Sequence, residues 1–257
     1  MDQALVAKGG VHKCRSLGLI VILTVASIML WDVPSVAWLL APVKIFVTAL
    51  HELGHAVACL ATGGSVSGLT IVSDNSGHGG LTMCRGGNPF VYDQTGYLGT
   101  AFFGCLFILI GRFPLVAKTM LFLIGLGIGT ASLILMPADL VQPGSILQGI
   151  GSIAWGLTIA AALIWCGLKL RPALAQFLLL FLAVQTALNA LTDVWLLIQL
   201  SLGLYPVSTF SDATNMAEMT HIPAFIWSLL WGLVSLLMLA GTLWLSYRPG
   251  RRRATPI

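Results

Sequence analysis

The sequence predicts an all-α, polytopic membrane protein with six or seven transmembrane helices and a small membrane-associated β-hairpin region. Of its 257 residues, 57% are apolar and only 9% are charged, whereas soluble domains carry about 25% charged residues. Several stretches reach the roughly 20 mainly apolar residues that a helical span needs. One long polar segment, 63–95, follows the second of them. Nothing divides the chain, so we expect a single domain over 1–257.

Seven apolar stretches are candidate spans, and prolines, which start or stop helices, stand at several of their boundaries. The stretches are 16–31, 35–62, 96–113, 115–136, 145–168, 173–201 and 222–247. Pro42 lies inside the second stretch, so we expect the regular helix there to begin near Val43. The first stretch follows several basic residues, as a signal peptide does, but no small-residue cleavage site comes after it. We therefore expect an uncleaved first span.

The polar segment 63–95 combines turn residues with short β-prone pieces. Leu69–Val72 and Leu81–Cys84 flank the turn sequence Asn75-Ser76-Gly77, which predicts a hairpin beside the membrane. A second polar connection spans 202–221, and 248–257 forms a basic C-terminal tail. The basic residues leave the orientation in the membrane open, because their distribution depends on whether the span count is odd or even.

The motif His51-Glu52-Leu53-Gly54-His55 lies inside the second apolar stretch. Residues four apart stack on one face of a helix, so both imidazoles can reach the same metal ion. Glu52 is rotated by about 100° from His51 and can reach a water on the metal instead. Zinc lowers the pKa of such a water to roughly 7, and Glu52 is expected to take its proton and pass it to a leaving amine. Ionisable groups at membrane depth are costly, which favours a functional site over buried structural histidines.

A catalytic zinc site needs a third protein ligand and an open position. Three carboxylates are candidates. Asp139 and Asp212 lie at a helix boundary and in a polar loop, where capping is the simpler role, and Ser211-Asp212 fits the start of a further segment. Asp193 lies within an apolar helix and needs a partner there, so we expect it to be the third ligand, with pairing to Lys44 as the alternative. Asn189 lies one turn earlier on the same face and is expected to steady the site or bind substrate backbone.

These residues resemble the site-2 protease family of intramembrane zinc metalloproteases. His51-Glu52-Leu53-Gly54-His55-Ala56 is similar to that family's H-E-x-G-H-A helix, and Gly96-Tyr97-Leu98-Gly99 occupies the place of a later glycine-containing helix start. The resemblance implies a membrane-associated β region and a zinc ligand from a distant helix, which suggests Asp193. The second motif departs from the family pattern, because no proline separates Asn189 from Asp193 and no glycine follows the aspartate. It looks like a divergent, peptidase-like branch of bacterial type.

The sequence therefore predicts a zinc-dependent metalloendopeptidase that cleaves membrane-protein substrates within a lipid bilayer, with a bacterial cell membrane as the expected location. The alternative is a non-proteolytic membrane protein, a transporter or scaffold with a structural metal site. The net charge of +4 forms no basic stripe with aromatics, which argues against nucleic-acid binding. The five cysteines show no C-x-x-C spacing, so we expect neither a disulfide framework nor a cysteine zinc site. Nothing in the sequence indicates an oligomeric state.

Overall fold

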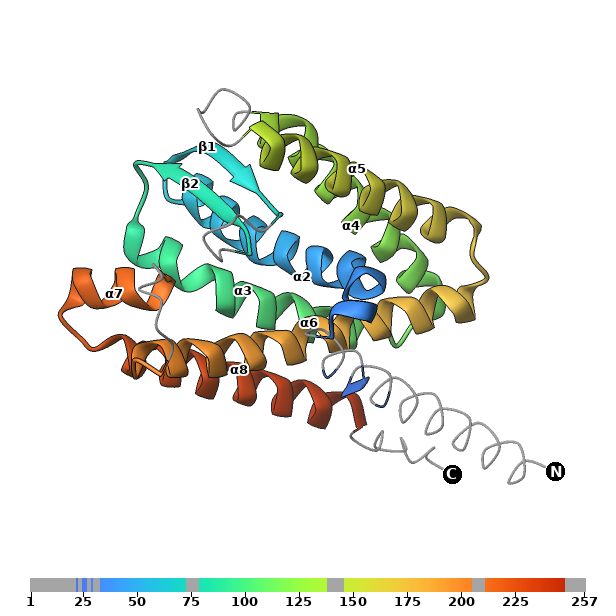
Figure 1. Cartoon of the computed structure of the whole chain (residues 1–257). Coiled ribbons are helices and arrows are strands. Elements are labelled where there is room, and N and C mark those ends of the chain that lie inside the picture. The colour runs from blue at the N-terminus through green and yellow to red at the C-terminus, as the bar shows by residue number, and fades with distance from the viewer. Residues whose placement is uncertain are drawn as a thin grey trace.

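The computed structural model describes residues 33–72, 79–137, 146–204 and 211–247, together with Ile22, Val25, Ala26 and Met29. These residues form seven helices and two strands (Figure 1). The elements are α2 (Pro34–Ala61), β1 (Ser65–Thr70), β2 (Leu81–Arg85), α3 (Pro89–Ile110), α4 (Pro114–Ile134), α5 (Ile146–Lys169), α6 (Pro172–Ser201), α7 (Asp212–Thr220) and α8 (Ala224–Tyr247).

Six of the described helices are long and apolar enough to cross a membrane, namely all except the short α7. The predicted fold class is therefore confirmed. The expected first span, 16–31, and the basic tail, 248–257, lie outside the described ranges apart from a few residues of the former. The predicted start of the second helix near Val43 is wrong, because α2 is helical from Pro34 and contains Pro42 in its interior. Proline is tolerated within transmembrane helices, where neighbouring groups can satisfy the backbone acceptor it leaves free.

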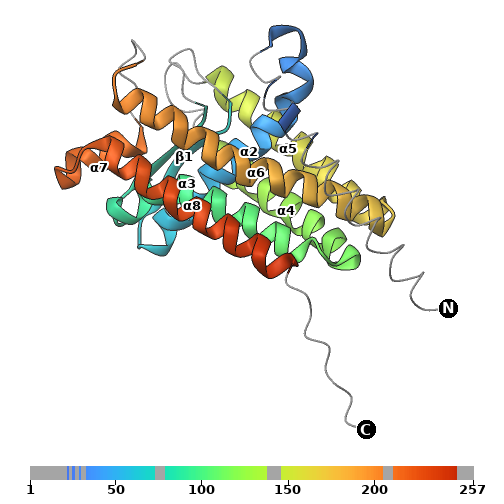
Figure 2. The ribbon, with the colours of Figure 1, turned by 90° about the horizontal axis from the view of Figure 1, so that it is seen from below.

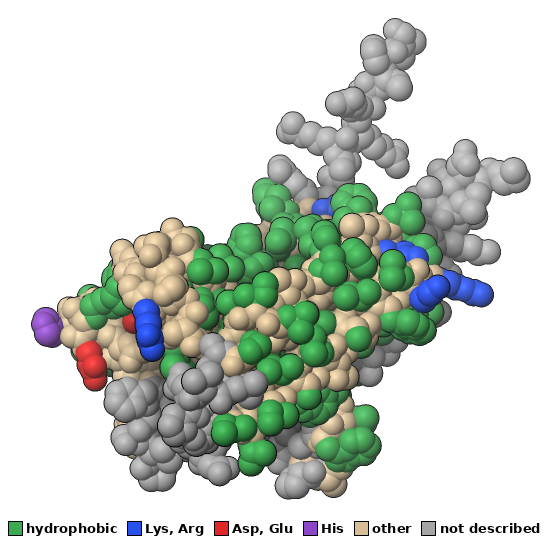
Figure 3. All heavy atoms as spheres, turned by 90° about the horizontal axis from the view of Figure 1, so that it is seen from above, with side chains coloured by type: hydrophobic (Ala, Val, Ile, Leu, Met, Phe, Trp, Pro, Cys, Tyr) green, Lys and Arg blue, Asp and Glu red, His purple; other side chains and the backbone are tan. Residues whose placement is uncertain are grey.

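The long helices form one bundle, and in the view of Figure 1 α2 and α3 lie between the α4–α5 pair and the α6–α8 pair. α4 also packs directly on α6, and Figure 2 shows the same bundle from below. The largest buried apolar cluster draws on five of them, from Phe46 of α2 to Leu179 of α6. Large apolar side chains also cover the outside, such as Leu147, which is 85% exposed. Hydrophobic side chains dominate the visible face in Figure 3, and charged side chains lie mainly toward its two ends. Such a surface suits contact with lipid.

The predicted hairpin is present as a two-stranded antiparallel sheet with an irregularity between Val66 and Gly68. It packs on the bundle through Leu69 and Ile71, which are fully buried in a cluster that also contains Ala56 of α2. One expectation was wrong: Cys59 of α2 and Cys84 of β2 form a disulfide. An odd cysteine count and irregular spacing gave no sign of it, because the pairing depends on how the hairpin folds back over α2.

The connection 202–221, expected only as a polar segment, contains the short helix α7. Ser211 caps its start in a reciprocal capping box with Thr214, which satisfies two backbone N–H groups of the first turn. Ala213 and Met216 of α7 are completely buried against α6 and α8. This packing fixes α7 beside the first turns of α3.

Candidate metal centre

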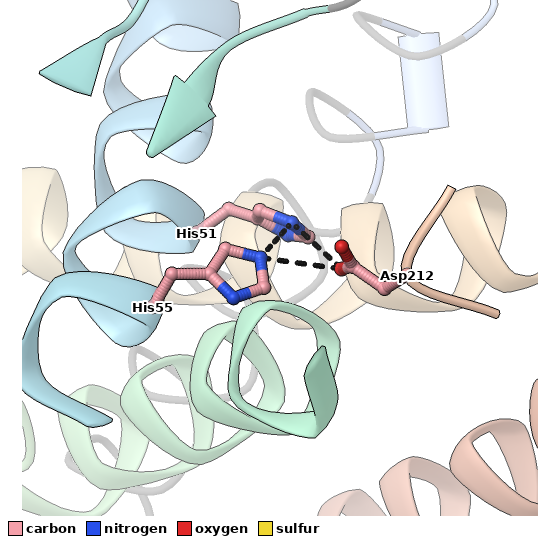
Figure 4. Close-up of side chains that lie close together, drawn as sticks. All are labelled: His51, His55 and Asp212. Atoms are coloured by element: carbon pink, nitrogen blue, oxygen red, sulfur yellow. Dashed lines mark hydrogen bonds and ion pairs between the residues drawn. The ribbon is translucent and has the colours of Figure 1, made fainter. Parts of the chain in front are cut away.

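α2 places His51 and His55 on one face, as the four-residue spacing predicts. Their Nε2 atoms lie 3.1 Å apart, and Figure 4 shows both rings turned toward the same point. The ring of Tyr97 from α3 packs edge-on against His51, with centroids 4.7 Å apart. The two imidazoles are therefore held as a converging pair.

The carboxylate that meets this pair is Asp212, the first residue of α7. Its Oδ2 atom lies 3.5 Å from His51 Nε2 and 3.2 Å from His55 Nε2 (Figure 4). Within the described ranges, His51, His55 and Asp212 form the group of side chains that could hold a metal ion. Two helices far apart in the sequence thus supply one cluster.

A backbone contact sets the tautomer of His55. Its Nδ1 lies 2.8 Å from the carbonyl oxygen of Tyr92, and a carbonyl can only accept a hydrogen bond. Nδ1 therefore carries the proton and donates it to Tyr92, which leaves a lone pair on Nε2. This carbonyl contact is the usual way in which a metal-binding histidine is oriented.

Gly96 of α3 faces the Nε2 atoms of the two imidazoles. A Cβ atom added at this position would collide with the Nε2 atoms of both His51 and His55. α2 and α3 also approach closely at Gly54, where a Cβ would meet the carbonyl of Thr95. The glycines permit a helix contact that leaves room for the two rings.

The donor set fits a zinc ion. Zinc binds imidazole nitrogen and carboxylate oxygen at about 2.0–2.2 Å, so neighbouring ligands in a tetrahedral site lie about 3.3–3.6 Å apart. The three observed separations, 3.1, 3.2 and 3.5 Å, are close to that range. In addition, Asp212 Oδ2 is a buried oxygen that accepts no regular hydrogen bond within the described part of the chain, and a cation would satisfy it.

The electrostatics of Asp212 favour its ionised form. Burial by itself would raise the pKa of this carboxyl, but the neighbouring imidazoles of His55 and His51, when they are protonated, outweigh burial and hold the pKa well below its ordinary value. Because the pKa of Asp212 is lowered, its carboxylate stays charged at neutral pH. Asp212 is thus available as an anionic ligand.

Glu52 is adjacent to the cluster and buried, at 5% exposure. Its carboxylate accepts a hydrogen bond from the hydroxyl of Thr82 on β2, 2.7 Å away. A carboxylate at this depth without a cationic partner of its own requires such a donor. The predicted general base therefore lies next to the imidazole pair and accepts a hydrogen bond from the hairpin.

The structure does not bring Asp193 into the metal-binding group. Asp193 accepts a hydrogen bond from the side chain of Asn189, 2.6 Å away on the preceding turn of α6, and it lies within electrostatic range of His51 and Lys44. The partner that a buried carboxylate needs is thus supplied locally, by the residue expected to bind substrate. The carboxylate that lies with His51 and His55 is Asp212, for which sequence reasoning had favoured capping. Asp139, the other candidate, lies outside the described residues.

The chain was compared with known proteins. It matches the family model described as Peptidase M50B-like over residues 19–242, which is most of its length. The chain belongs to this peptidase family. No curated protein and no solved structure matches it.

Membership confirms the resemblance to the site-2 proteases. Together with the six apolar helices, it identifies an integral, multi-pass membrane protein of a peptidase family. The H-E-x-x-H motif lies within the matched region, and so does Asp212.

Proposed function

We propose that the protein is a zinc-dependent intramembrane endopeptidase in which His51, His55 and Asp212 bind the metal and Glu52 is the general base. The observation that carries this proposal is the convergence of two imidazole Nε2 atoms and one carboxylate oxygen, all within 4.8 Å of one another. Three protein ligands leave a fourth position open, as catalytic zinc sites require. Asp212 takes the place that sequence reasoning gave to Asp193.

The chemistry follows from the positions of these groups. Zinc, when bound, supplies Lewis acidity that polarises a carbonyl and acidifies water. Glu52 lies beside the pair without joining it, and in this proposal it takes a proton from the attacking water and delivers it to the leaving amine. His55, with its proton fixed on Nδ1 by Tyr92, keeps its Nε2 lone pair directed at the site.

The substrates in this proposal are membrane proteins, cleaved in or beside a transmembrane segment within the lipid bilayer of a bacterial cell. In this proposal an unwound substrate strand adds to the hairpin, because the sheet in the described part of the chain has two strands and no third strand beside either of them. Asn189 keeps its expected role of contacting substrate backbone in this proposal, and one N–H of its side chain is directed to Asp193.

The proposal is tested with purified protein in proteoliposomes and a set of synthetic single-span peptides, with products identified by mass spectrometry. We expect about one zinc per chain and cleavage of at least one peptide by the wild type. Glu52→Gln is the matched control, since it should keep the zinc and lose cleavage. Zinc binding without cleavage of any peptide would favour the scaffold alternative, and cleavage that persists in Glu52→Gln would refute the mechanism.

A further inference from the structure

Strand β2 lies against α2 at the level of Glu52. The hydroxyl of Thr82 is 2.7 Å from Glu52 Oε2 and 3.1 Å from the Glu52 backbone oxygen. Both side chains are buried, Thr82 at 4% and Glu52 at 5% exposure. A hydroxyl has a single proton, and the shorter contact directs it to the carboxylate, where a hydrogen bond to a charged acceptor is stronger than one between neutral groups.

The other carboxylate oxygen is confined by Gly80, in the approach to the same strand. A Cβ atom at Gly80 would lie 2.7 Å from Glu52 Oε1 and 2.8 Å from the Thr48 methyl group. The backbone of the chain therefore borders Oε1 while Thr82 holds Oε2. Together they restrict the rotation of the carboxylate about its side-chain bonds.

Thr82 is itself fixed in place from two directions. The hydroxyl of Tyr92 on α3 donates a hydrogen bond to the Thr82 carbonyl. The disulfide between Cys84 and Cys59 fastens β2 to α2. Cys84 follows Thr82 by two residues on the strand, and Cys59 follows Glu52 by about two helical turns, so each pair shares one face of its element. β2 thus contacts α2 both at the carboxylate and at the disulfide.

We propose that Thr82 is a positioning residue for Glu52, holding the carboxylate in the orientation from which it accepts a proton. This inference rests on the proposed function. The Thr82 hydroxyl contacts Glu52 and, within the described part of the chain, makes no hydrogen bond to His51, His55 or Asp212. Its loss should therefore affect the rate of the reaction and not the binding of the metal. Displacement of a catalytic group by about 1 Å can lower a rate about a hundredfold.

The activity test compares Thr82→Val, which keeps the shape and removes the hydroxyl, with Thr82→Ser, which keeps the hydroxyl. The probe is the single-span peptide that the wild type cuts fastest. We expect Thr82→Val to lower kcat by about 10- to 100-fold, with KM within about twofold and zinc content unchanged. Thr82→Ser should stay within about threefold of the wild type. A wild-type kcat in Thr82→Val, or equal losses in both variants, would overturn the proposal.

A second readout needs no catalysis. Thermal unfolding is measured on chelator-treated wild type, Thr82→Val, Glu52→Ala and the double variant. If the two side chains are paired, Thr82→Val lowers the midpoint in the wild type by more than twice as much as it does in the Glu52→Ala background. Equal shifts would reject the contact itself. A coupled pair in a protein that cuts no peptide would instead reject the proposed function, and the positioning role with it.

Discussion

Asp193 on α6 and Asp212 on α7 are both acidic residues enclosed by the bundle, yet their surroundings differ. Asp193 lies within a membrane span and accepts a hydrogen bond from Asn189, one turn away on its own helix. Asp212 begins a short helix outside the spans, and its Oδ2 faces two imidazoles on another element. Asp193 accepts a hydrogen bond from its own helix, whereas Asp212 faces side chains that are far away in the sequence.

If Asp212 is the ligand, as we propose, then position within a membrane span does not identify the ligand. A carboxylate in the interior of a helix can accept a hydrogen bond from a side chain four residues away on the same helix. A carboxylate at a helix start is held by the cap beneath it and points away from its own helix, so it is free to meet another element. Position relative to a helix end therefore carries information that burial does not.

The largest effect is expected when each of the two aspartates is replaced in turn and zinc binding is compared. Asp212→Ala should lower zinc affinity by more than about a hundredfold, because losing a ligand costs more than losing the outer contacts that cost 10- to 100-fold, and it should abolish cleavage. Asp193→Asn should keep about one zinc per chain. Metal analysis of the two purified variants side by side provides the measurement. Zinc retained in Asp212→Ala and lost in Asp193→Asn would reverse the comparison.

A second test addresses the space in which the two histidines converge. Gly96→Ala should displace His51 and His55, because the new methyl group would collide with both Nε2 atoms, and zinc affinity should fall at least about tenfold. Gly99→Ala is the matched control on the same helix, since its Cβ would make an ordinary contact, 3.5 Å from Gly54 Cα. Isothermal titration with zinc measures both. Equal affinity in the two variants would argue against the close packing described at Gly96.

The hydrogen bond from Asn189 to Asp193 can be tested by removing the donor side chain. Asn189→Ala leaves a carboxylate without its hydrogen bond, at a cost of about 2 kcal/mol in stability. We expect a lower unfolding midpoint in calorimetry with the zinc content unchanged, and a raised KM if Asn189 also contacts substrate. Asn189→Asp/Asp193→Asn, which exchanges the two groups, should recover part of the loss. A variant that is stable but metal-free would instead place this pair in the metal site.

The smallest effect concerns the cap beneath Asp212. Ser211→Ala removes the side chain that accepts from the backbone N–H of Thr214, and loss of such a cap costs about 1 kcal/mol. Because this end of α7 carries Asp212, we expect zinc affinity to weaken by no more than about fivefold, the equivalent of 1 kcal/mol. Competition with a zinc-binding dye detects changes of this size. Ser211→Thr keeps the cap and should bind as the wild type does; equal weakening in Ser211→Thr would contradict the role of the cap.

The features that depend on local pattern are predictable from this sequence. The six described spans follow from apolar length, the hairpin from turn residues between β-prone pieces, and the convergence of His51 and His55 from a four-residue spacing on a helix. Each of these signals lies within one element or between adjacent elements. Their physical cause is contained in a short stretch of chain.

The remaining parts of the site depend on tertiary packing. The sequence Ser211-Asp212 does indicate a helix start, and α7 has the capping box that such a start favours. Nothing local, however, shows that the buried Ala213 and Met216 dock this helix where its first residue meets α2. The same holds for Cys59 with Cys84 and for Thr82 with Glu52, because both contacts require the hairpin to fold back over α2.

The Cys59–Cys84 bond also predicts how the bundle is oriented in a bilayer. Disulfides form and persist in oxidising compartments and are rare in a reducing cytosol, so we expect the end of the bundle that carries the hairpin to face away from the cytoplasm. At the opposite end, the α3–α4 and α5–α6 connections bring together basic side chains, and Lys118 there donates to the carbonyl of Leu168. Basic connections favour the cytoplasmic side. Thiol chemistry and loop charge thus lead to the same prediction, that the hairpin end of the bundle faces the exterior of the cell.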